Sequence, residues 1–174
     1  MVAMGFMQSI KVCLSKYVVF SGRATRSEYW WFVLFVVLSS IVLAVLDQTI
    51  FGTNPDTGES ANVLNSGFQL AVFLPMLAVG WRRLHDTGRP GWYLLLPLAL
   101  GLATMIALLS GVAVFSALES GVDDPEALRG PAAFLGLTGM IVVWGLQLVL
   151  SIMMIWWLTR PSQEGDNAYG PPAV

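Results

Sequence analysis

Four long apolar stretches constrain this chain more than any other feature of its sequence. They cover about residues 29–50, 63–81, 92–118 and 132–158, and Asp47 is the one charged residue inside them. About 20 consecutive apolar residues are enough for a helix to cross the hydrocarbon core of a bilayer. In a helix every backbone polar group is also satisfied within the segment itself. The sequence therefore predicts an all-α polytopic membrane protein with four transmembrane helices, forming a single membrane domain.

The composition fits a bilayer better than water as the solvent of this protein. Hydrophobic residues make up 56% of the chain and charged residues only 11%, whereas soluble domains contain about 25% charged residues. The net charge of −2 argues against nucleic acid as a partner, because phosphate binding requires clustered positive charge. The single Cys13 excludes an internal disulfide and a metal site made of several thiolates. We expect no cofactor and no metal.

The segment of residues 6–20 precedes the first apolar stretch and is too short and too charged to span a membrane. Lys11 and Lys16 lie on one side of it, and its apolar residues recur at helical spacing on the other. This pattern predicts an amphipathic helix lying in the membrane interface. Because short helices are marginally stable alone, the alternative is a disordered tail. The apolar residues are Phe6, Met7, Ile10, Leu14, Tyr17 and Val18.

Two residues predict local features of the second span. Pro75 lies in its middle and removes one backbone hydrogen bond, which predicts a kink. Membrane helices tolerate such a proline where a neighbouring group or a water satisfies the freed carbonyl. Gly88 follows the span and is expected to adopt a positive φ that ends the helix.

The basic residues predict the orientation of the chain in the membrane. With four spans, eight of the nine lysines and arginines fall on one face. Short loops rich in these residues stay on the cytoplasmic side. Both termini, including the tail of residues 159–174, are therefore predicted to be cytoplasmic. The residues on that face are Lys11, Lys16, Arg23, Arg26, Arg82, Arg83, Arg89 and Arg160, and Arg129 falls on the other.

The segment from Gly80 to Trp92, GWRRLHDTGRPGW, concentrates polar chemistry between two apolar stretches. It contains three arginines, the only histidine and a tryptophan near each edge, a pattern typical of a loop at a membrane surface. The predicted topology brings it to the same face as the segments before the first span and after the fourth. We expect these segments to form one polar cap in which carboxylates pair with arginines. The candidate residues are Arg23, Arg26, Glu28, Arg82, Arg83, His85, Asp86, Arg89, Trp92, Asp166 and Asn167.

Three blocks of this sequence, in order, resemble the signature of a known family. They are FSGRATRSEYWWF from Phe20, RRLHDTGRPGW from Arg82 and GDNAYGP from Gly165. Together they resemble the YhaH-like family of small bacterial inner-membrane proteins, a domain-of-unknown-function family, over about Lys16 to Pro171. Arg89-Pro90 departs from the serine that is usual there, and the loop of residues 119–131 is longer than common. The resemblance implies a multi-span protein of the bacterial inner (plasma) membrane. It implies no established activity, cofactor or catalytic residue.

The function that the residues favour is a non-enzymatic membrane module. Its basic, tryptophan-flanked cap would bind anionic lipid headgroups or a partner protein, since each basic residue near a cytoplasmic leaflet contributes about 1 kcal/mol toward anionic lipid. A homo-oligomer is a further possibility. The plainer alternative is that the arginines only fix the topology and pair with the carboxylates of the cap.

Two other classes of function are alternatives. An enzyme acting on lipid headgroups would use His85 as a base, with Asp86 or Glu28 orienting it and arginines holding phosphate. Against this, His85 and Asp86 are adjacent, and neighbours on a helix do not share a face. A small transporter or channel subunit would need polar groups at membrane depth, where the spans offer Gln147 and scattered hydroxyls.

Overall fold

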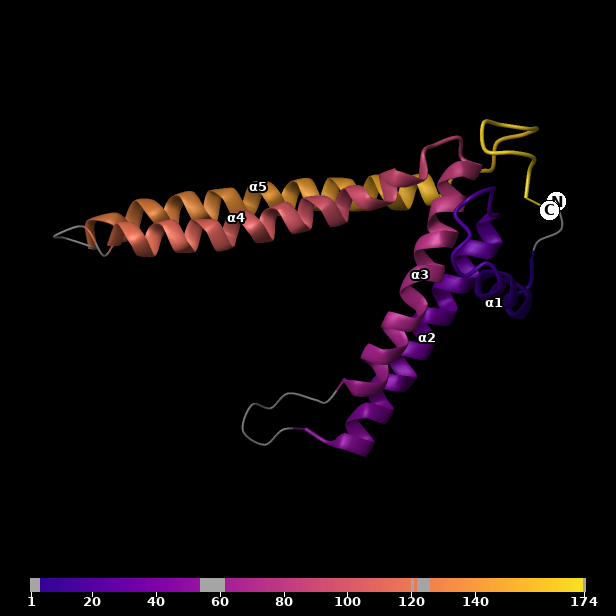
Figure 1. The fold of residues 1–174 in the computed structure, drawn as a ribbon, viewed down its shortest axis with the longest axis horizontal. Helices are drawn as coiled ribbons and strands as arrows, with labels where there is room; N and C mark the ends of the chain where they lie inside the picture. The colour runs from indigo at the N-terminus through magenta and orange to yellow at the C-terminus, as the bar shows by residue number, and fades with distance from the viewer. Residues whose placement is uncertain (1–3, 54–61, 120, 122–125, 174) are drawn as a thin grey trace. The chain divides into compact units, whose positions relative to one another are not determined.

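The computed structural model describes residues 4–53, 62–119, 121 and 126–173 of this chain. Across these ranges the chain forms helices and, apart from isolated bridges such as Asn167 with Gly170, no β-strand. The all-α prediction is confirmed. The elements are α1 (Phe6–Ser15), α2 (Arg26–Phe51), α3 (Val63–Asp86), the 3₁₀ helix η1 (Gly91–Leu95), α4 (Leu96–Glu119) and α5 (Glu126–Thr159) (Figure 1).

Within the described ranges, four helical segments are long and apolar enough to cross a membrane, as predicted. They are Arg26–Phe51, Val63–Asp86, Gly91–Ser116 and Gly136–Thr159. The helix of the second span, α3, extends past Trp81, the predicted end of that span, so Arg82, Arg83 and His85 are helical.

The second long helix ends where the sequence places its glycine. Gly88 has φ +73°. The amide of Arg89 donates to the Leu84 carbonyl and the amide of Gly88 to the His85 carbonyl, each at 3.0 Å. These two bonds form a Schellman motif, in which a residue at positive φ satisfies the last carbonyls of a helix. Because glycine adopts positive φ without strain, this ending was predictable from the sequence.

The chain divides into two compact units, and each is described by itself. Unit 1 comprises Met1–Tyr93 and Leu158–Val174, and unit 2 comprises Leu94–Trp157. In unit 1, α2 and α3 run side by side, and α1 packs against both (Figure 1). In unit 2, α4 and α5 form a helical hairpin in which the Gln147 side-chain amide donates to the Pro97 carbonyl at 3.3 Å.

The short helix α1 buries two small residues against the protein and exposes apolar residues on its other side. Ser9 and Cys13 are fully buried, whereas Met7 is 65% exposed and Leu14 is 44% exposed. Burial raises the pKa of the Cys13 thiol to about 12, and the nearby Glu28 carboxylate makes a smaller contribution to this increase. The helix ends at Ser15, earlier than the predicted residue 20. An exposed apolar face on a short, partly basic helix is what insertion into the membrane interface requires.

A tyrosine supplies the hydrogen bond that Pro75 removes from α3. In an unbroken helix the amide of residue 75 would donate to the carbonyl of Ala71, and proline has no amide hydrogen. The hydroxyl of Tyr17, in the segment after α1, donates to that carbonyl instead. A neighbouring side chain therefore satisfies the freed backbone group, as the sequence predicts for a proline inside a membrane helix.

The one charged residue inside the predicted spans has a structural partner. Asp47 on α2 is fully buried, and its two carboxylate oxygens accept hydrogen bonds from the amides of Leu64 and Asn65 at 2.8 and 2.9 Å. These amides lie in the first turn of α3, and the amide groups of a first turn have no hydrogen-bond acceptor within their own helix. Asp47 thus caps α3 from the neighbouring helix, and its negative charge suits the positive end of the helix dipole.

Candidate functional site

The segment before α2 is fixed by a helix cap and by one backbone bond to α3. Thr25 caps α2, because its hydroxyl oxygen accepts a hydrogen bond from the amide of Glu28 at 3.1 Å. The amide of Ala24 donates to the carbonyl of Arg82 at 3.1 Å. These bonds place Arg23 just before the helix and Glu28 in its first turn, both facing the end of α3.

The carboxylate of Asp86 is the centre of a buried network of charges. The Nε atom of Arg23 donates to one of its oxygens at 2.9 Å, and Arg83 and Ser162 donate to the other. The three charged side chains of this group are at most 1% exposed. A buried charge is tolerated only where it is paired and hydrogen-bonded, and Asp86 meets that condition at both oxygens.

A second buried ion pair lies beside the first. Arg82 Nη1 donates to Glu28 Oε1 at 2.7 Å, with side-chain exposures of 1% and 2%. The Sγ atom of Cys13 lies 4.0 Å from the same carboxylate oxygen, which ties α1 to this pair. We call the charged residues of the two groups, Arg23, Glu28, Arg82, Arg83 and Asp86, the buried network.

The arginines of the buried network also hold the C-terminal tail through its backbone. Arg83 donates to the carbonyls of Leu158, near the end of α5, and of Arg160 in the tail, and Arg23 Nη1 donates to the Gly165 carbonyl at 2.7 Å. The amide of Gln163 donates to the main-chain carbonyl of Asp86 at 3.0 Å. The guanidinium group has five N–H donors in a rigid fork, so one arginine can bind a carboxylate and the tail together.

His85 is engaged by neighbours on several sides. Its Nδ1 atom lies 3.1 Å from the carbonyl of Gly22, and its ring stacks on Tyr169 with centroids 3.8 Å apart and planes at 4°. The side-chain amide of Asn167 donates to the His85 carbonyl at 2.9 Å. Among the hydrogen bonds of the described residues, none joins His85 to a carboxylate, because Asp86 is directed to Arg23 and Arg83.

The structure brings seven of the predicted cap residues together and leaves the others at the edge. Arg26 and Asp166 are exposed, Trp92 is 51% exposed, and Arg89 is half-buried and donates to the Thr87 carbonyl at 3.1 Å. Burial lowers the pKa of Arg89, and the nearby Arg160 lowers it further. The seven gathered residues are Arg23, Glu28, Arg82, Arg83, His85, Asp86 and Asn167.

Several participants were absent from the predicted list. Tyr169 stacks on His85, and Ser162 donates to Asp86. Tyr169 lies inside the third sequence block, and its membership of that block was the only sequence feature that could have identified it as a site residue. Gln163 lies against Gly88, where an added Cβ would come within 2.5 Å of its side-chain nitrogen. Nothing in a polar tail without periodicity predicts such contacts.

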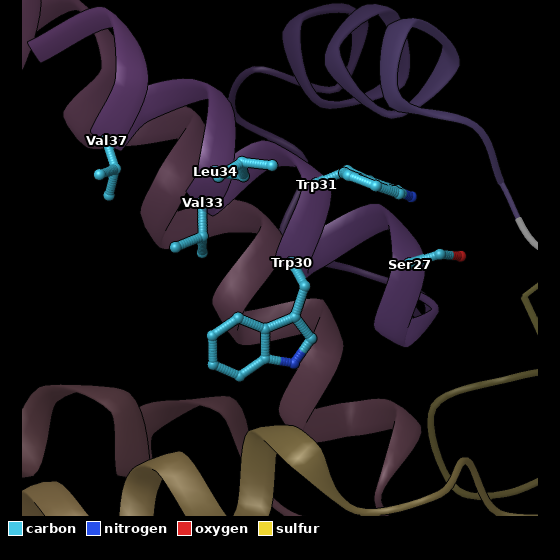
Figure 2. A pocket seen from close by; sticks show the side chains of 6 residues that line it. All are labelled: Ser27, Trp30, Trp31, Val33, Leu34 and Val37. Carbon is cyan, nitrogen blue, oxygen red and sulfur yellow. The ribbon is translucent and has the colours of Figure 1, made fainter.

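A shallow apolar groove runs along the outer face of α2. Its volume is about 400 Å³ and its lining is almost entirely carbon. Figure 2 shows the two tryptophans and the aliphatic side chains that form it. Trp31 packs edge-on against Phe6 of α1 at 5.7 Å, and Trp30 against Tyr29 at 5.2 Å. The lining residues are Ser27, Trp30, Trp31, Val33, Leu34 and Val37.

The described residues contain no cluster of three or more histidine, cysteine or carboxylate side chains that would hold a metal ion. Four apolar helices and buried charges at the end of one helix pair define this chain as a small polytopic membrane protein.

The chain belongs to the DUF805 family, described as proteins of unknown function, whose model matches residues 17–171. This match confirms the resemblance of the three sequence blocks.

Two relatives in Escherichia coli (strain K12) are named inner membrane proteins. The chain is 45% identical to inner membrane protein YhaH over 83 residues, which are 48% of this chain and 66% of the relative. It is 43% identical to inner membrane protein YhaI over 83 residues, which are 48% of this chain and 64% of the relative. The aligned part is just under two thirds of each relative. No solved structure matches this chain.

Proposed function

We propose that this chain is a non-enzymatic module of the bacterial inner membrane, with both termini cytoplasmic, that binds anionic phospholipid through the exposed basic residues of unit 1. The observation that carries this proposal is the separation of the basic residues into two groups. One group is buried and paired inside the protein, and the other is exposed beside an amphipathic helix.

The buried group acts as internal support. Arg23, Arg82 and Arg83 are at most 5% exposed, and each is paired with Glu28 or Asp86. Removing one partner of a buried pair costs about 3–5 kcal/mol, because it leaves an uncompensated charge. These arginines hold the start of α2, the end of α3 and the tail together. Lipid recognition is therefore assigned to residues other than Arg82 and Arg83.

The exposed group is placed where headgroups would meet it. Lys11, Lys16 and Arg26 are exposed on α1, just after it and at the start of α2. Each contributes about 1 kcal/mol of attraction to an anionic leaflet. The exposed apolar residues Met7 and Leu14 favour insertion of α1 at headgroup depth. The predicted excess of basic residues on this face supports a cytoplasmic orientation.

A structural role for His85 supports the non-enzymatic assignment. Its ring is stacked on Tyr169 and its Nδ1 atom faces the Gly22 carbonyl. A general base needs an open path to the proton that it removes and is usually oriented by a further polar group. The stacked ring with a backbone partner holds the tail against α3 instead.

The test is the lipid composition retained by the purified protein. Native mass spectrometry would count lipids bound from micelles that contain equal amounts of phosphatidylglycerol and phosphatidylcholine. We expect the triple variant Lys11→Gln/Lys16→Gln/Arg26→Gln to lose on the order of 100-fold of its phosphatidylglycerol preference, since three charges contribute about 1 kcal/mol each and about 1.4 kcal/mol corresponds to a factor of ten. The control Lys11→Arg/Lys16→Arg/Arg26→Lys keeps the charges and should keep the preference. An unchanged preference in the Gln variant would contradict the proposal, and co-purification of a protein in place of lipid would favour a protein partner.

A further inference from the structure

We infer that Arg26 and the apolar groove on α2 together form a seat for one anionic phospholipid, with the phosphate at Arg26 and one acyl chain along the groove. This inference rests on the proposed function and deepens it, because it assigns a defined site where the proposal requires only a basic surface.

The cation and the groove share one face of α2. Trp30 follows Arg26 by four residues, and Val33, Leu34 and Val37 continue the same row at spacings of three and four. Residues so spaced are neighbours on a helix surface. Arg26 is therefore one turn beyond the end of the groove formed by Trp30, and it lies at the start of α2. The order from cation to tryptophan to aliphatic residues matches the order from headgroup to acyl chain in a lipid.

The charge at this end of the groove is available to a ligand. Arg26 is exposed, and no ion pair within the described ranges includes it. The nearest carboxylate along the helix, Glu28, is buried and bound by Arg82. A phosphate would meet a guanidinium group without competition from that carboxylate, and arginine binds phosphate with two parallel N–H donors.

The length and lining of the groove suit one acyl chain. From Ser27 to Val37, the first and last lining residues, the helix rises about 15 Å at roughly 1.5 Å per residue. That length is close to one leaflet of a hydrocarbon core about 30 Å thick. The walls are also fixed before a lipid arrives, because Trp31 is held by Phe6 of α1 and Trp30 by Tyr29. A preformed groove loses less conformational freedom on binding than a flexible one.

The experiment compares a variant that fills the groove with a matched variant outside it. Val33→Phe places a ring among the lining residues, whereas Val42→Phe makes the same change at an exposed position of α2 beyond the groove. After stringent removal of lipid in detergent, native mass spectrometry would count the phosphatidylglycerol molecules that stay bound. We expect one retained molecule in the wild type and in Val42→Phe, and at least a fivefold lower occupancy in Val33→Phe.

Arg26→Gln provides a second variant that leaves the groove unfilled and changes an exposed side chain. It should lower the occupancy by phosphatidylglycerol at least threefold, and by a larger factor than the occupancy by phosphatidylcholine, in which the choline cation offsets the charge of the phosphate. Quenching of tryptophan fluorescence by phosphatidylglycerol with brominated acyl chains should fall in Trp30→Phe, because that ring lines the groove. Equal retention in wild type, Val33→Phe and Arg26→Gln would overturn the seat.

The failure of the seat and the failure of the proposed function are distinguishable. If Lys11→Gln/Lys16→Gln lowers the general preference for phosphatidylglycerol while Val33→Phe and Arg26→Gln retain the bound lipid, the seat is wrong and the basic surface stands. If Val33→Phe and Arg26→Gln release the retained lipid while Lys11→Gln/Lys16→Gln has no effect, the seat stands and the wider surface is wrong.

Discussion

The two units of this protein differ in burial: among the described residues, unit 1 buries charged side chains, whereas unit 2 leaves most of its apolar side chains exposed. In unit 1 the largest fully buried side chains include Arg82, Arg83 and Asp86, while much of its apolar surface is exposed. In unit 2 the helices are apolar all round, and Leu109 and Trp144 are 62% and 77% exposed. A helix that is apolar all round is typical of a membrane span. Because lipid tails are as apolar as these side chains, no hydrophobic driving force favours burying the side chains of unit 2 within the protein.

This difference indicates how each unit obtains a unique structure. Unit 1 is specified by directional bonds: Asp86 accepts from Arg23 and Arg83, Glu28 accepts from Arg82, and Asp47 caps α3. In unit 2 the side-chain amide of Gln147 donates to the Pro97 carbonyl, and the described glycines of α4 and α5 have open space at their Cβ positions. Substitutions should therefore have large effects in unit 1 when they remove a polar partner, and small effects in unit 2 when they shorten a lipid-facing side chain.

The largest effect is expected from Asp86→Asn. The variant leaves Arg23 and Arg83 buried without their shared negative charge, and breaking such a pair costs about 3–5 kcal/mol. We expect the apparent unfolding temperature in detergent to fall by about 10 °C, measured by fluorescence-detected size-exclusion chromatography after heating. The tail should also become accessible to protease, because Arg23 and Arg83 bind its backbone at Gly165 and Arg160.

The control for this prediction is Asp166→Asn, which removes the same charge from an exposed position of the tail. Surface substitutions usually change stability by less than about 0.5 kcal/mol. If both variants unfold at the same temperature, the buried network does not determine the stability of unit 1.

The next effect is expected from Gly88→Ala. The alanine must adopt φ +73°, and its Cβ would lie 2.5 Å from the side chain of Gln163. We expect a loss of about 1–2 kcal/mol from the positive φ alone, measured as above. Adding Gln163→Ala should recover only the part that arises from the contact. Gly67→Ala is the control, since Gly67 lies within α3 with open space around its Cβ position, and it should be neutral or stabilising.

A smaller effect is expected from Tyr17→Phe. The variant removes the hydroxyl that donates to the Ala71 carbonyl, which Pro75 leaves without its helical partner. Because this hydrogen bond is exposed, its loss costs about 0.5–1.5 kcal/mol, the net contribution of a typical hydrogen bond. In the background of Pro75→Ala the amide of residue 75 donates to Ala71 instead, so Tyr17→Phe should then have little effect. Equal losses in both backgrounds would show that Tyr17 contributes by packing and not by this bond.

These residues also show how far the sequence alone could predict the structure. The spans follow from length and hydropathy, and the end of α3 follows from Gly88, because both signals are local. Pro75 identifies the Ala71 carbonyl as the group that needs a donor, since the missing bond always spans four residues. The donor Tyr17 was not predictable, because it comes from a segment 54 residues away in the sequence.

The partners within the candidate site show the same limit. The sequence predicts that arginines and carboxylates gather on one face, but not which ones pair between different elements. Arg83 and Asp86 pair at a spacing of three residues on α3, and this spacing makes residues neighbours on a helix surface. The pairs Arg82–Glu28 and Arg23–Asp86 join α3 to the start of α2 and the segment before it, so they depend on how these elements pack. The tail residues Ser162 and Tyr169 have no periodic pattern that would position them.

The smallest effect is expected in unit 2, from Leu109→Ala. Leu109 is 62% exposed on α4, so its truncation creates no internal cavity and leaves lipid to fill the space. Leu84→Ala in unit 1 is the comparison, because Leu84 is fully buried and leucine-to-alanine changes in cores cost about 2–5 kcal/mol. We expect Leu109→Ala to change the free energy of unfolding by less than about 0.5 kcal/mol, measured by unfolding in increasing SDS. A loss as large as that of Leu84→Ala would mean that Leu109 is covered by protein in the membrane, and a concentration-dependent mass would identify a second copy of this chain as the cover.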